Sequence, residues 1–219
     1  MDSQAKERLA AIGEIAAEVA HELRNTLQVI AASAYLARQD PPASLQHILK
    51  IEKNARVAHG IVDDLMSLAR GEPAHAEPVL FAEIVVAARA DVSPDAAVWT
   101  DAIAPSDLRV RAHPGLLTRL FHVLYENAIG ASQGRPPQIS TQAWADGARV
   151  IIEVADDGPG VPRDIAPRIF DPLVTGRTGG TGLGLALARR IAAAHGGTIE
   201  LAATTTAGAT FRVELPGAR

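Results

Sequence analysis

Apolar residues recur at alternating spacings of three and four positions over the first 71 residues, and this pattern predicts two long helices. The segment Asp40-Pro41-Pro42 ends the first helix because proline cannot continue a helix, and Ser44 is suited to cap the second. The repeating positions are Leu9, Ile12, Ala16, Val19, Leu23, Thr26, Ile30, Ser33 and Ala37, then Ile48, Ile51, Ala55, Ala58, Val62, Leu65 and Ala69. Two antiparallel helices share one apolar seam and cannot enclose a core. We therefore expect a homodimer in which two hairpins form a four-helix bundle.

Strand-like and helix-like stretches alternate after a proline-containing linker at residues 72–78. The patterns predict helices at 81–90, 114–131 and about 184–195, and strands at 98–101, 108–112, 138–145, 149–155, 198–203 and 210–215. Strands covered by helices on one face form a two-layer α/β sandwich. The expected fold class is α+β, with a helical hairpin at residues 1–71 and a sandwich domain at residues 79–219.

Composition and charge exclude several classes of protein. The 219 residues are 47% hydrophobic and 21% charged, which is typical of a folded chain of one or two domains. A net charge of −4 gives no electrostatic reason to expect nucleic-acid binding, and the absence of cysteine excludes disulfides and thiolate metal sites. No apolar run reaches the length of a membrane span, and the charged N-terminus is unlike a signal peptide, so we expect a cytoplasmic location.

Two glycine-rich stretches give the first chemical signal. Asp156-Asp157-Gly158-Pro159-Gly160 follows an apolar strand, and Gly179-Gly180-Thr181-Gly182-Leu183-Gly184 opens an apolar helix. Glycine lets backbone N–H groups approach an anion, and a helix N-terminus favours negative charge, so a phosphate is the ligand that fits. Neither stretch matches a P-loop or a dinucleotide-binding fingerprint, and each one alone could equally be a structural turn.

The order of these stretches along the chain carries more information. Asn127 lies on a helix rich in apolar residues, and the two glycine-rich stretches follow it. Asn127, Asp156-x-Gly158-x-Gly160 and Gly180-Thr181-Gly182-Leu183-Gly184 in that order resemble the ATP-binding domain of sensor histidine kinases and their gyrase and chaperone ATPase relatives. Ile169-Phe170-Asp171-Pro172 resembles the phenylalanine motif of that family, and Gly208-Ala209-Thr210-Phe211 matches its last sheet motif.

The N-terminal hairpin indicates which branch of these relatives applies. Ala20-His21-Glu22-Leu23-Arg24-Asn25 resembles the phosphoacceptor box of histidine kinases. The heptad pattern places His21 and Asn25 one turn apart on the outer face of the helix. A zinc-protease motif is excluded, because Asn25 stands where His-Glu-x-x-His needs its second histidine.

The resemblance implies ATP as the substrate and Mg²⁺ as the metal. Asp156 would accept a hydrogen bond from the adenine amine, and Asn127 would hold Mg²⁺ through its amide oxygen. The residues implied around the phosphates are Gly158, Gly160, Gly180, Thr181, Gly182, Leu183 and Gly184. Arg177 would reach the γ-phosphate, or it would be a surface side chain of a mobile lid.

The resemblance also implies a phosphoryl relay. His21 would be the nucleophile, with Glu22 as the base that takes or holds the proton of its other ring nitrogen. The phosphoryl group would pass to an aspartate of a response-regulator receiver domain. Asn25 would orient the water that dephosphorylates the regulator.

Four residues depart from the family pattern, and one of them is Leu173, which replaces the second aromatic residue of the phenylalanine motif. Thr26 replaces the proline after the phosphoacceptor box, Val123 replaces a first asparagine, and Gly130 replaces a common lysine. The last two favour an alternative, a degenerate relay protein that passes phosphate through His21 without ATP turnover. A further alternative is an ATP-regulated module that binds a partner such as a sigma factor. A chaperone- or gyrase-type ATPase is disfavoured, because those enzymes carry a catalytic glutamate at the position of Val123.

Overall fold

The computed structural model divides the chain into two compact units, Met1–Gly71 and Glu72–Arg219. The residues that it describes are 23–24, 26–39, 42, 44–52, 54–55, 58, 62, 76–90, 92, 96–132, 135–172, 174–176 and 182–218. Among these residues, no helix has the length and apolar character that crossing a membrane requires.

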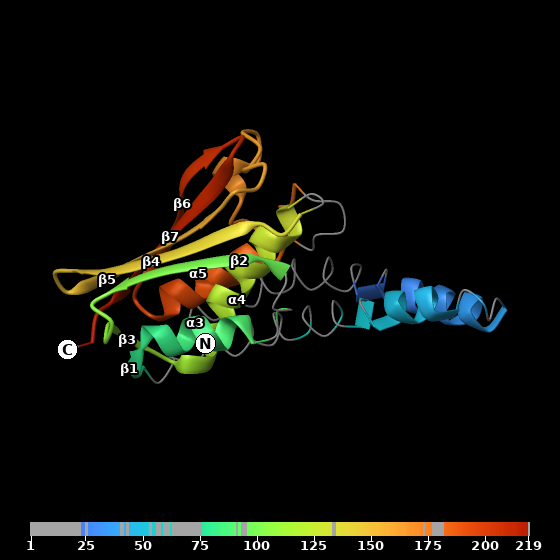
Figure 1. Cartoon of the computed structure of the whole chain (residues 1–219), viewed down its shortest axis with the longest axis horizontal. Coiled ribbons are helices and arrows are strands. Elements are labelled where there is room, and N and C mark those ends of the chain that lie inside the picture. The colour runs from blue at the N-terminus through green and yellow to red at the C-terminus, as the bar shows by residue number, and fades with distance from the viewer. Residues whose placement is uncertain are drawn as a thin grey trace, which may run out of the picture. The chain divides into compact units, whose positions relative to one another are not determined.

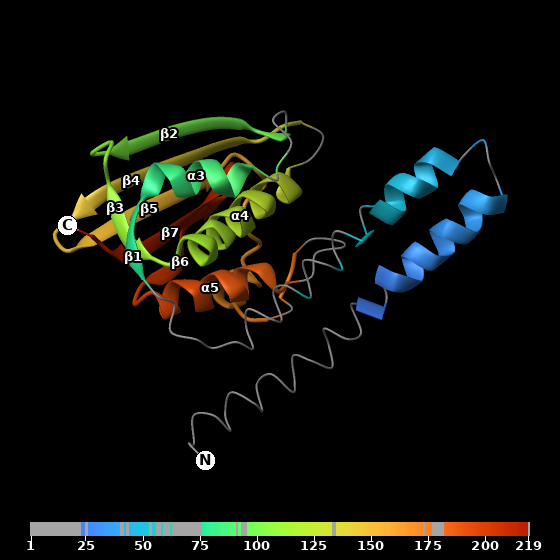
Figure 2. The ribbon, with the colours of Figure 1, turned by 90° about the horizontal axis from the view of Figure 1, so that it is seen from below.

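The first unit contains two helical stretches, residues 26–39 and 44–52, that lie antiparallel and side by side (Figures 1 and 2). On the first stretch, Thr26 and Ser33 are buried, and the other described seam positions are half-buried. The apolar repeat therefore predicted the inward face of this helix correctly.

The second stretch differs in part from the predicted seam. Its half-buried positions are Ser44, His47, Ile51, Asn54 and Ala58. Ile48, Ala55 and Val62 were predicted in the seam but are exposed in the single hairpin. A helix in a four-helix bundle contacts two neighbours, and one hairpin supplies only one of them.

The second unit contains three longer helices and seven strands among its described residues. It begins with β1 (Glu77–Leu80), α3 (Phe81–Arg89), β2 (Val98–Ala104), β3 (Arg109–Ala112) and α4 (Pro114–Ala131). It continues with β4 (Gln138–Asp146), β5 (Arg149–Asp156), a 3-10 turn (Ala166–Arg168), α5 (Gly184–Ala194), β6 (Thr198–Thr205) and β7 (Gly208–Pro216). Glu77 and Pro78, which were expected in the linker, belong to β1, and β1 pairs antiparallel with β3.

The main sheet has the strand order β2-β4-β5-β7-β6, and only the β2–β4 pair is parallel. Helices α3, α4 and α5 cover one face of this sheet (Figure 2). Alternate strand residues point into that interface, and the buried ones are Ile139, Thr141, Ala143, Val150, Ile152, Val154, Ile199, Phe211, Val213 and Leu215. The arrangement confirms the predicted two-layer α/β sandwich.

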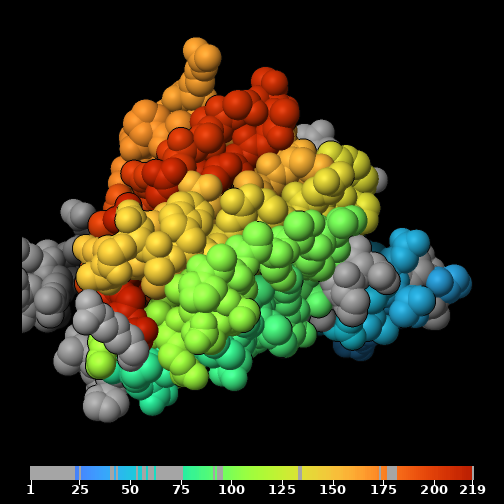
Figure 3. Space-filling view, turned by 60° about the vertical axis from the view of Figure 1, so that its left-hand side comes forward, coloured from blue at the N-terminus to red at the C-terminus, as the bar shows by residue number. Residues whose placement is uncertain are grey.

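The opposite face of the sheet carries polar side chains. The strands lie next to one another on the surface there (Figure 3). Arg212 of β7 bridges Glu153 of β5 at 2.7 Å and Glu200 of β6 at 3.4 Å. Because antiparallel neighbours place these residues opposite one another, their charges stabilise the strand register.

A half-buried arginine joins α3 to the edge of the sheet. Arg89 donates two hydrogen bonds to Asp101 of β2, at 2.8 and 2.6 Å. Its guanidinium also stacks over Trp99 at 4.2 Å and lies 5.2 Å from the ring centroid of Tyr125. The Tyr125 hydroxyl is 3.0 Å from Oγ1 of Thr141, so α3, α4, β2 and β4 meet in one cluster. Burial disfavours the charge on Arg89, but the hydrogen bonds to Asp101 and the electrostatic attraction of Tyr125 and Asp101 together outweigh it, so the pKa of Arg89 is raised.

We expect Arg89→Met to lower the free energy of unfolding of the second unit by about 1–2 kcal/mol, because it removes a half-buried, bidentate ion pair and a stacked cation. Urea denaturation followed by tryptophan fluorescence measures this change. The matched control is Arg212→Met on the open face of the sheet, where solvent screens the charges and the decrease should be smaller. Equal effects of the two substitutions would contradict a special role for the Arg89 cluster.

Candidate nucleotide-binding site

The carboxylate of Asp156 lies at the end of the central strand β5. Its Oδ1 accepts a hydrogen bond from the backbone N–H of Gly158 at 2.8 Å, which folds the chain back over the side chain. The pKa of Asp156 is raised, chiefly because burial disfavours its charged form. A carboxylate that is both oriented and partly desolvated is suited to accept one hydrogen bond from a ligand.

Asp157 faces the other way and anchors the same loop. Its Oδ2 pairs with Arg135 at 2.8 Å, and its Oδ1 accepts the N–H of Gln138 at 2.8 Å. The hydrogen bond from Arg135 lowers the pKa of Asp157. The two adjacent aspartates therefore differ in role. Asp157 attaches the loop to Arg135 and Gln138, whereas Asp156 has neither of these partners and accepts the N–H of Gly158.

Two glycines let the loop and the β6–β7 hairpin approach backbone to backbone. A side chain on Gly208 would overlap the carbonyl oxygen of Asp156, and one on Gly160 would overlap that of Thr205. Both residues have left-handed φ values, +137° and +74°. Thr204 closes the contact by accepting the N–H of Val161 at 2.7 Å.

The second glycine-rich stretch ends at the N-terminus of α5. Gly182 has a φ of +66°, and the next residue, Leu183, is buried and forms the N-cap. A leucine at this position supplies no side-chain cap, so the first-turn N–H groups of α5 rely on other partners. An anion such as phosphate is a suitable partner for a helix N-terminus.

Helix α4 packs against both glycine-rich stretches. Val123, Asn127 and Ala131 follow one another at intervals of one turn, on one side of the helix. Cγ1 of Val123 lies 3.1 Å from where a Cβ of Gly184 would be. In the same way, Cβ of Ala131 lies 3.8 Å from where a Cβ of Gly158 would be. Asn127, which is half-buried, therefore lies between the start of α5 and the Asp156 loop.

The phenylalanine motif packs beside this site. Phe170 contacts Phe211 of β7 edge-to-face, with ring centroids 6.1 Å apart. Asp171 lies 3.5 Å from Arg189 of α5 and 3.5 Å from Arg168. The segment after the Asp156 loop is thus connected to both the sheet and α5.

Sequence reasoning selected several residues that the structure places together and several that it does not describe. Asn127, Asp156, Gly158, Gly160, Gly182, Leu183 and Gly184 lie in the region formed by α4, the end of β5 and the start of α5. His21, Glu22, Asn25, Arg177, Gly180 and Thr181 lie outside the described residues. Arg135 was missed because a pairing across 22 residues of sequence leaves no local signal.

His195 was also left without a role by the sequence. Its Nε2 accepts the backbone N–H of His113 at 3.0 Å, and its Nδ1 lies 2.7 Å from the carbonyl oxygen of Ile191. Burial lowers the pKa of His195, which favours the neutral ring that this pair of bonds requires. His195 therefore ties the end of α5 to the start of α4.

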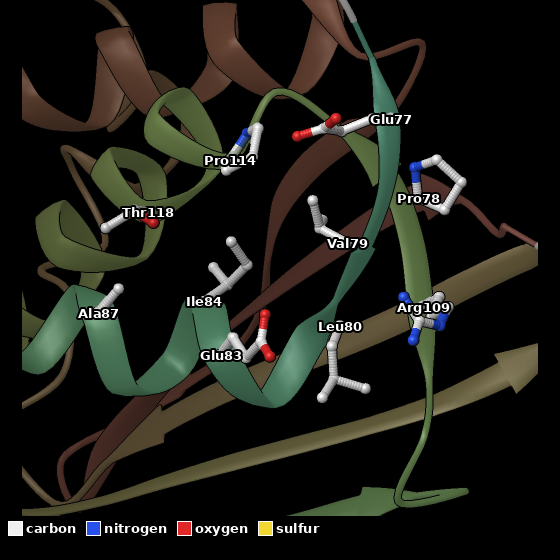
Figure 4. Close-up of a pocket in the computed structure, with 10 residues that line it drawn as sticks. All are labelled: Glu77, Pro78, Val79, Leu80, Glu83, Ile84, Ala87, Arg109, Pro114 and Thr118. Atoms are coloured by element: carbon white, nitrogen blue, oxygen red, sulfur yellow. The ribbon is translucent and has the colours of Figure 1, made fainter.

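A separate cavity of about 430 Å³ lies among β1, α3, β3 and the start of α4 (Figure 4). Its lining includes Val79, Leu80, Ile84 and Pro114. Pro114 begins α4, whereas Asn127 lies more than three turns further along that helix. This cavity is therefore distinct from the site around Asp156.

Comparison with known proteins agrees with this geometry. Residues 112–219 match the family described as "Histidine kinase-, DNA gyrase B-, and HSP90-like ATPase". The chain is 38% identical to the sensor histidine kinase ZraS of Salmonella typhimurium, in an alignment that covers 96% of this chain and 47% of ZraS. The chain corresponds to the catalytic core of sensor histidine kinases. The chain spans about half the length of this curated relative.

Solved histidine kinases share the fold. Full-length ShkA in complex with AMPPNP superposes on 94% of this kinase chain and 46% of its own, with a TM-score of 0.66 and 25% identity. ThkA in complex with the response regulator TrrA superposes on 97% of this chain and 64% of its own, with a TM-score of 0.76 and 24% identity. The α+β fold of this chain is thus that of the solved histidine kinases.

We expect Gly208→Ala to lower the free energy of unfolding by roughly 3 kcal/mol, since a methyl group there overlaps the Asp156 carbonyl and the backbone is left-handed. Urea denaturation provides the measurement. Gly147→Ala is the control: its φ is +59°, but no atom lies within 4 Å of the added methyl group, so only about 1 kcal/mol of backbone strain is expected. Equal losses would show that conformation alone, and not the close approach, requires Gly208.

Proposed function

We propose that this chain is a protein-histidine kinase that transfers the γ-phosphoryl group of ATP to His21 and then to an aspartate of a response-regulator receiver domain. The observation that carries the proposal is the position of Asn127 between the Asp156 loop and the N-terminus of α5. The alignment with ZraS across 96% of the chain supports it, because it includes the phosphoacceptor hairpin as well as the ATPase domain.

The Asp156 loop is the proposed adenine site. The carboxylate of Asp156 is held by the backbone N–H groups of Gly158 and Ala209. A carboxylate can accept more than two hydrogen bonds, and we propose that it also accepts one from the adenine amine. The N-terminus of α5, with Gly180, Thr181, Gly182, Leu183 and Gly184, is proposed to surround the phosphates. Arg177 is proposed to neutralise charge on the γ-phosphate.

The residues present fit Mg²⁺ as the metal. The amide oxygen of Asn127 is a hard ligand, and Mg²⁺ commonly takes only one or two protein ligands together with substrate phosphates. Among the described residues, no group of three or more histidine, aspartate or glutamate side chains could hold a metal without such help. When bound, Mg²⁺ would neutralise phosphate charge.

The transfer itself uses the hairpin. A ring nitrogen of His21 attacks the γ-phosphorus, the bond from that phosphorus to the bridging oxygen breaks, and ADP leaves with the bonding electron pair. Glu22 takes the proton from the other ring nitrogen. An aspartate carboxylate of the receiver domain then attacks the phosphorus and the N–P bond breaks. Glu22 gives its proton back to the ring, which leaves a neutral His21. Asn25 is proposed to orient a water molecule that hydrolyses the aspartyl phosphate of the regulator and releases inorganic phosphate.

A homodimer is the proposed assembly. Large apolar residues of the hairpin have exposed fractions of 42–67%. They are Leu27, Val29, Tyr35, Leu36, Leu45, Ile48, Leu49 and Val62. Exposed apolar residues on a two-helix unit need a partner surface, and a second hairpin supplies one of matching shape. The solved complex of ThkA with TrrA supports a receiver domain as the other partner.

We expect Asp156→Asn to weaken ADP binding about 30-fold in calorimetry, because the asparagine oxygen would keep the Gly158 N–H and its NH₂ group would face the adenine amine. Asp157→Asn, which alters the neighbouring loop contact, should change the affinity only a few-fold. Wild-type affinity should also fall on acidification, starting above the ordinary aspartate range, because burial raises the pKa of Asp156 and protonation removes the negative charge that makes its carboxylate a strong acceptor. A similar loss in both variants would contradict the assignment of Asp156.

Incubation with magnesium and ATP labelled at the γ-phosphate tests the transfer. We expect acid-labile, alkali-stable label on the wild type and none on His21→Gln. His47→Gln, a histidine of the same hairpin, should keep the label. No label on the wild type, with ADP binding intact, would overturn autophosphorylation and leave the relay protein as the function.

A further inference from the structure

Val123 departs from the family's asparagine box, and the structure shows what it contacts instead. Its side chain is 5% exposed and lies on α4 one turn before Asn127. Its Cγ1 lies 3.1 Å, and its Cγ2 3.9 Å, from where a Cβ of Gly184 would be. Gly184 is the first residue of α5, so the two methyl groups press against the beginning of that helix.

The two glycines at the start of α5 are required for different reasons. Gly182 has a φ of +66°, a conformation that residues with side chains rarely adopt. Gly184 has no such φ, and its closest constraint is the Val123 side chain. The first glycine therefore serves the backbone turn, whereas the second serves the close approach of two helices.

The close approach of α4 and α5 at Val123 and Gly184 affects the proposed nucleotide site. Asn127 lies on the same side of α4 as Val123, and the first-turn N–H groups of α5 lie beyond Gly184. The distance between the proposed metal ligand and the proposed phosphate-binding helix end is thus set where Val123 meets Gly184. Packed interiors transmit shifts of a few tenths of an ångström, because neighbouring side chains leave little free space.

We infer that Val123 is a positioning residue for Mg·ATP: its packing against Gly184 sets the spacing between Asn127 and the N-terminus of α5. The inference rests on the proposed function and deepens it. It assigns shape, and not hydrogen bonding, to a position where the family carries a polar residue. A nucleotide that reaches α5 alone does not need this spacing, whereas a nucleotide bridged to Asn127 through Mg²⁺ does.

The measured quantity is the gain in ADP affinity on adding Mg²⁺, the ratio of the dissociation constants without and with the metal, from calorimetry on the full chain. Gly184→Ala should lower this ratio about tenfold, because the added methyl group and Val123 cannot both keep their places. In a Val123→Ala background the same Gly184→Ala change should lower the ratio by no more than about threefold. Val123→Thr, which keeps both branches, should retain the wild-type ratio.

Gly182→Ala is the matched control. Its strain comes from the backbone, so Val123→Ala should give no relief. Should Gly184→Ala fail to fold, Val123→Ile enlarges the same contact from the α4 side and should lower the ratio in its place. Thermal unfolding of each variant shows whether the protein is folded under the conditions of the titration.

Different results would overturn the proposed function and the positioning role of Val123. A wild type that binds no ADP, or gains nothing from Mg²⁺, would overturn the proposed function. A wild type that binds normally, with Gly184→Ala equally damaging in both backgrounds, would overturn the role of Val123 alone. Relief of Gly184→Ala by Val123→Ala, without relief of Gly182→Ala, is the result expected.

Discussion

Burial of a single face of the five-stranded sheet is the constraint on which the second unit depends. The apolar residues of β4, β5 and β7 alternate, so only one face can take α3, α4 and α5. Once α4 and α5 share that face, the end of β5 and the start of α5 meet α4 along the stripe that contains Asn127. The candidate site therefore forms because packing of α4 and α5 on one face of the sheet brings these segments together.

The site itself is formed where backbone approaches backbone. Gly160 and Gly208 bring the Asp156 loop against the β6–β7 hairpin, and Gly184 brings α5 against Val123. Small residues at these three contacts leave N–H groups and one carboxylate directed at a common region, while Arg135 and Asp157 secure the loop from outside. In the proposed function, a phosphate and a purine amine would use this combination of donors and acceptor.

Elements with strong periodicity were predicted well, and short or long-range features were not. The apolar repeats indicated α4 and the strands β4, β5 and β7 within one or two residues, because burial on one face imposes that pattern. β1 was missed because four residues beginning Glu77-Pro78 resemble a linker. The Arg89 cluster and the His195–His113 bond were missed because their partners are far apart in sequence.

The sequence by itself determined the types of chemistry available: a carboxylate and glycines at a strand end, an amide on a helix, glycines at a helix start, and a histidine in a hairpin. Each is a local pattern of residue type and spacing, so it is readable without coordinates. Only the tertiary structure decided that Asn127 lies between the two glycine-rich stretches. It also decided that a side chain at position 184 is restricted by contact with Val123 and not by the backbone conformation of Gly184. Such facts depend on which side chains meet after the core packs, and sequence spacing carries no record of that contact.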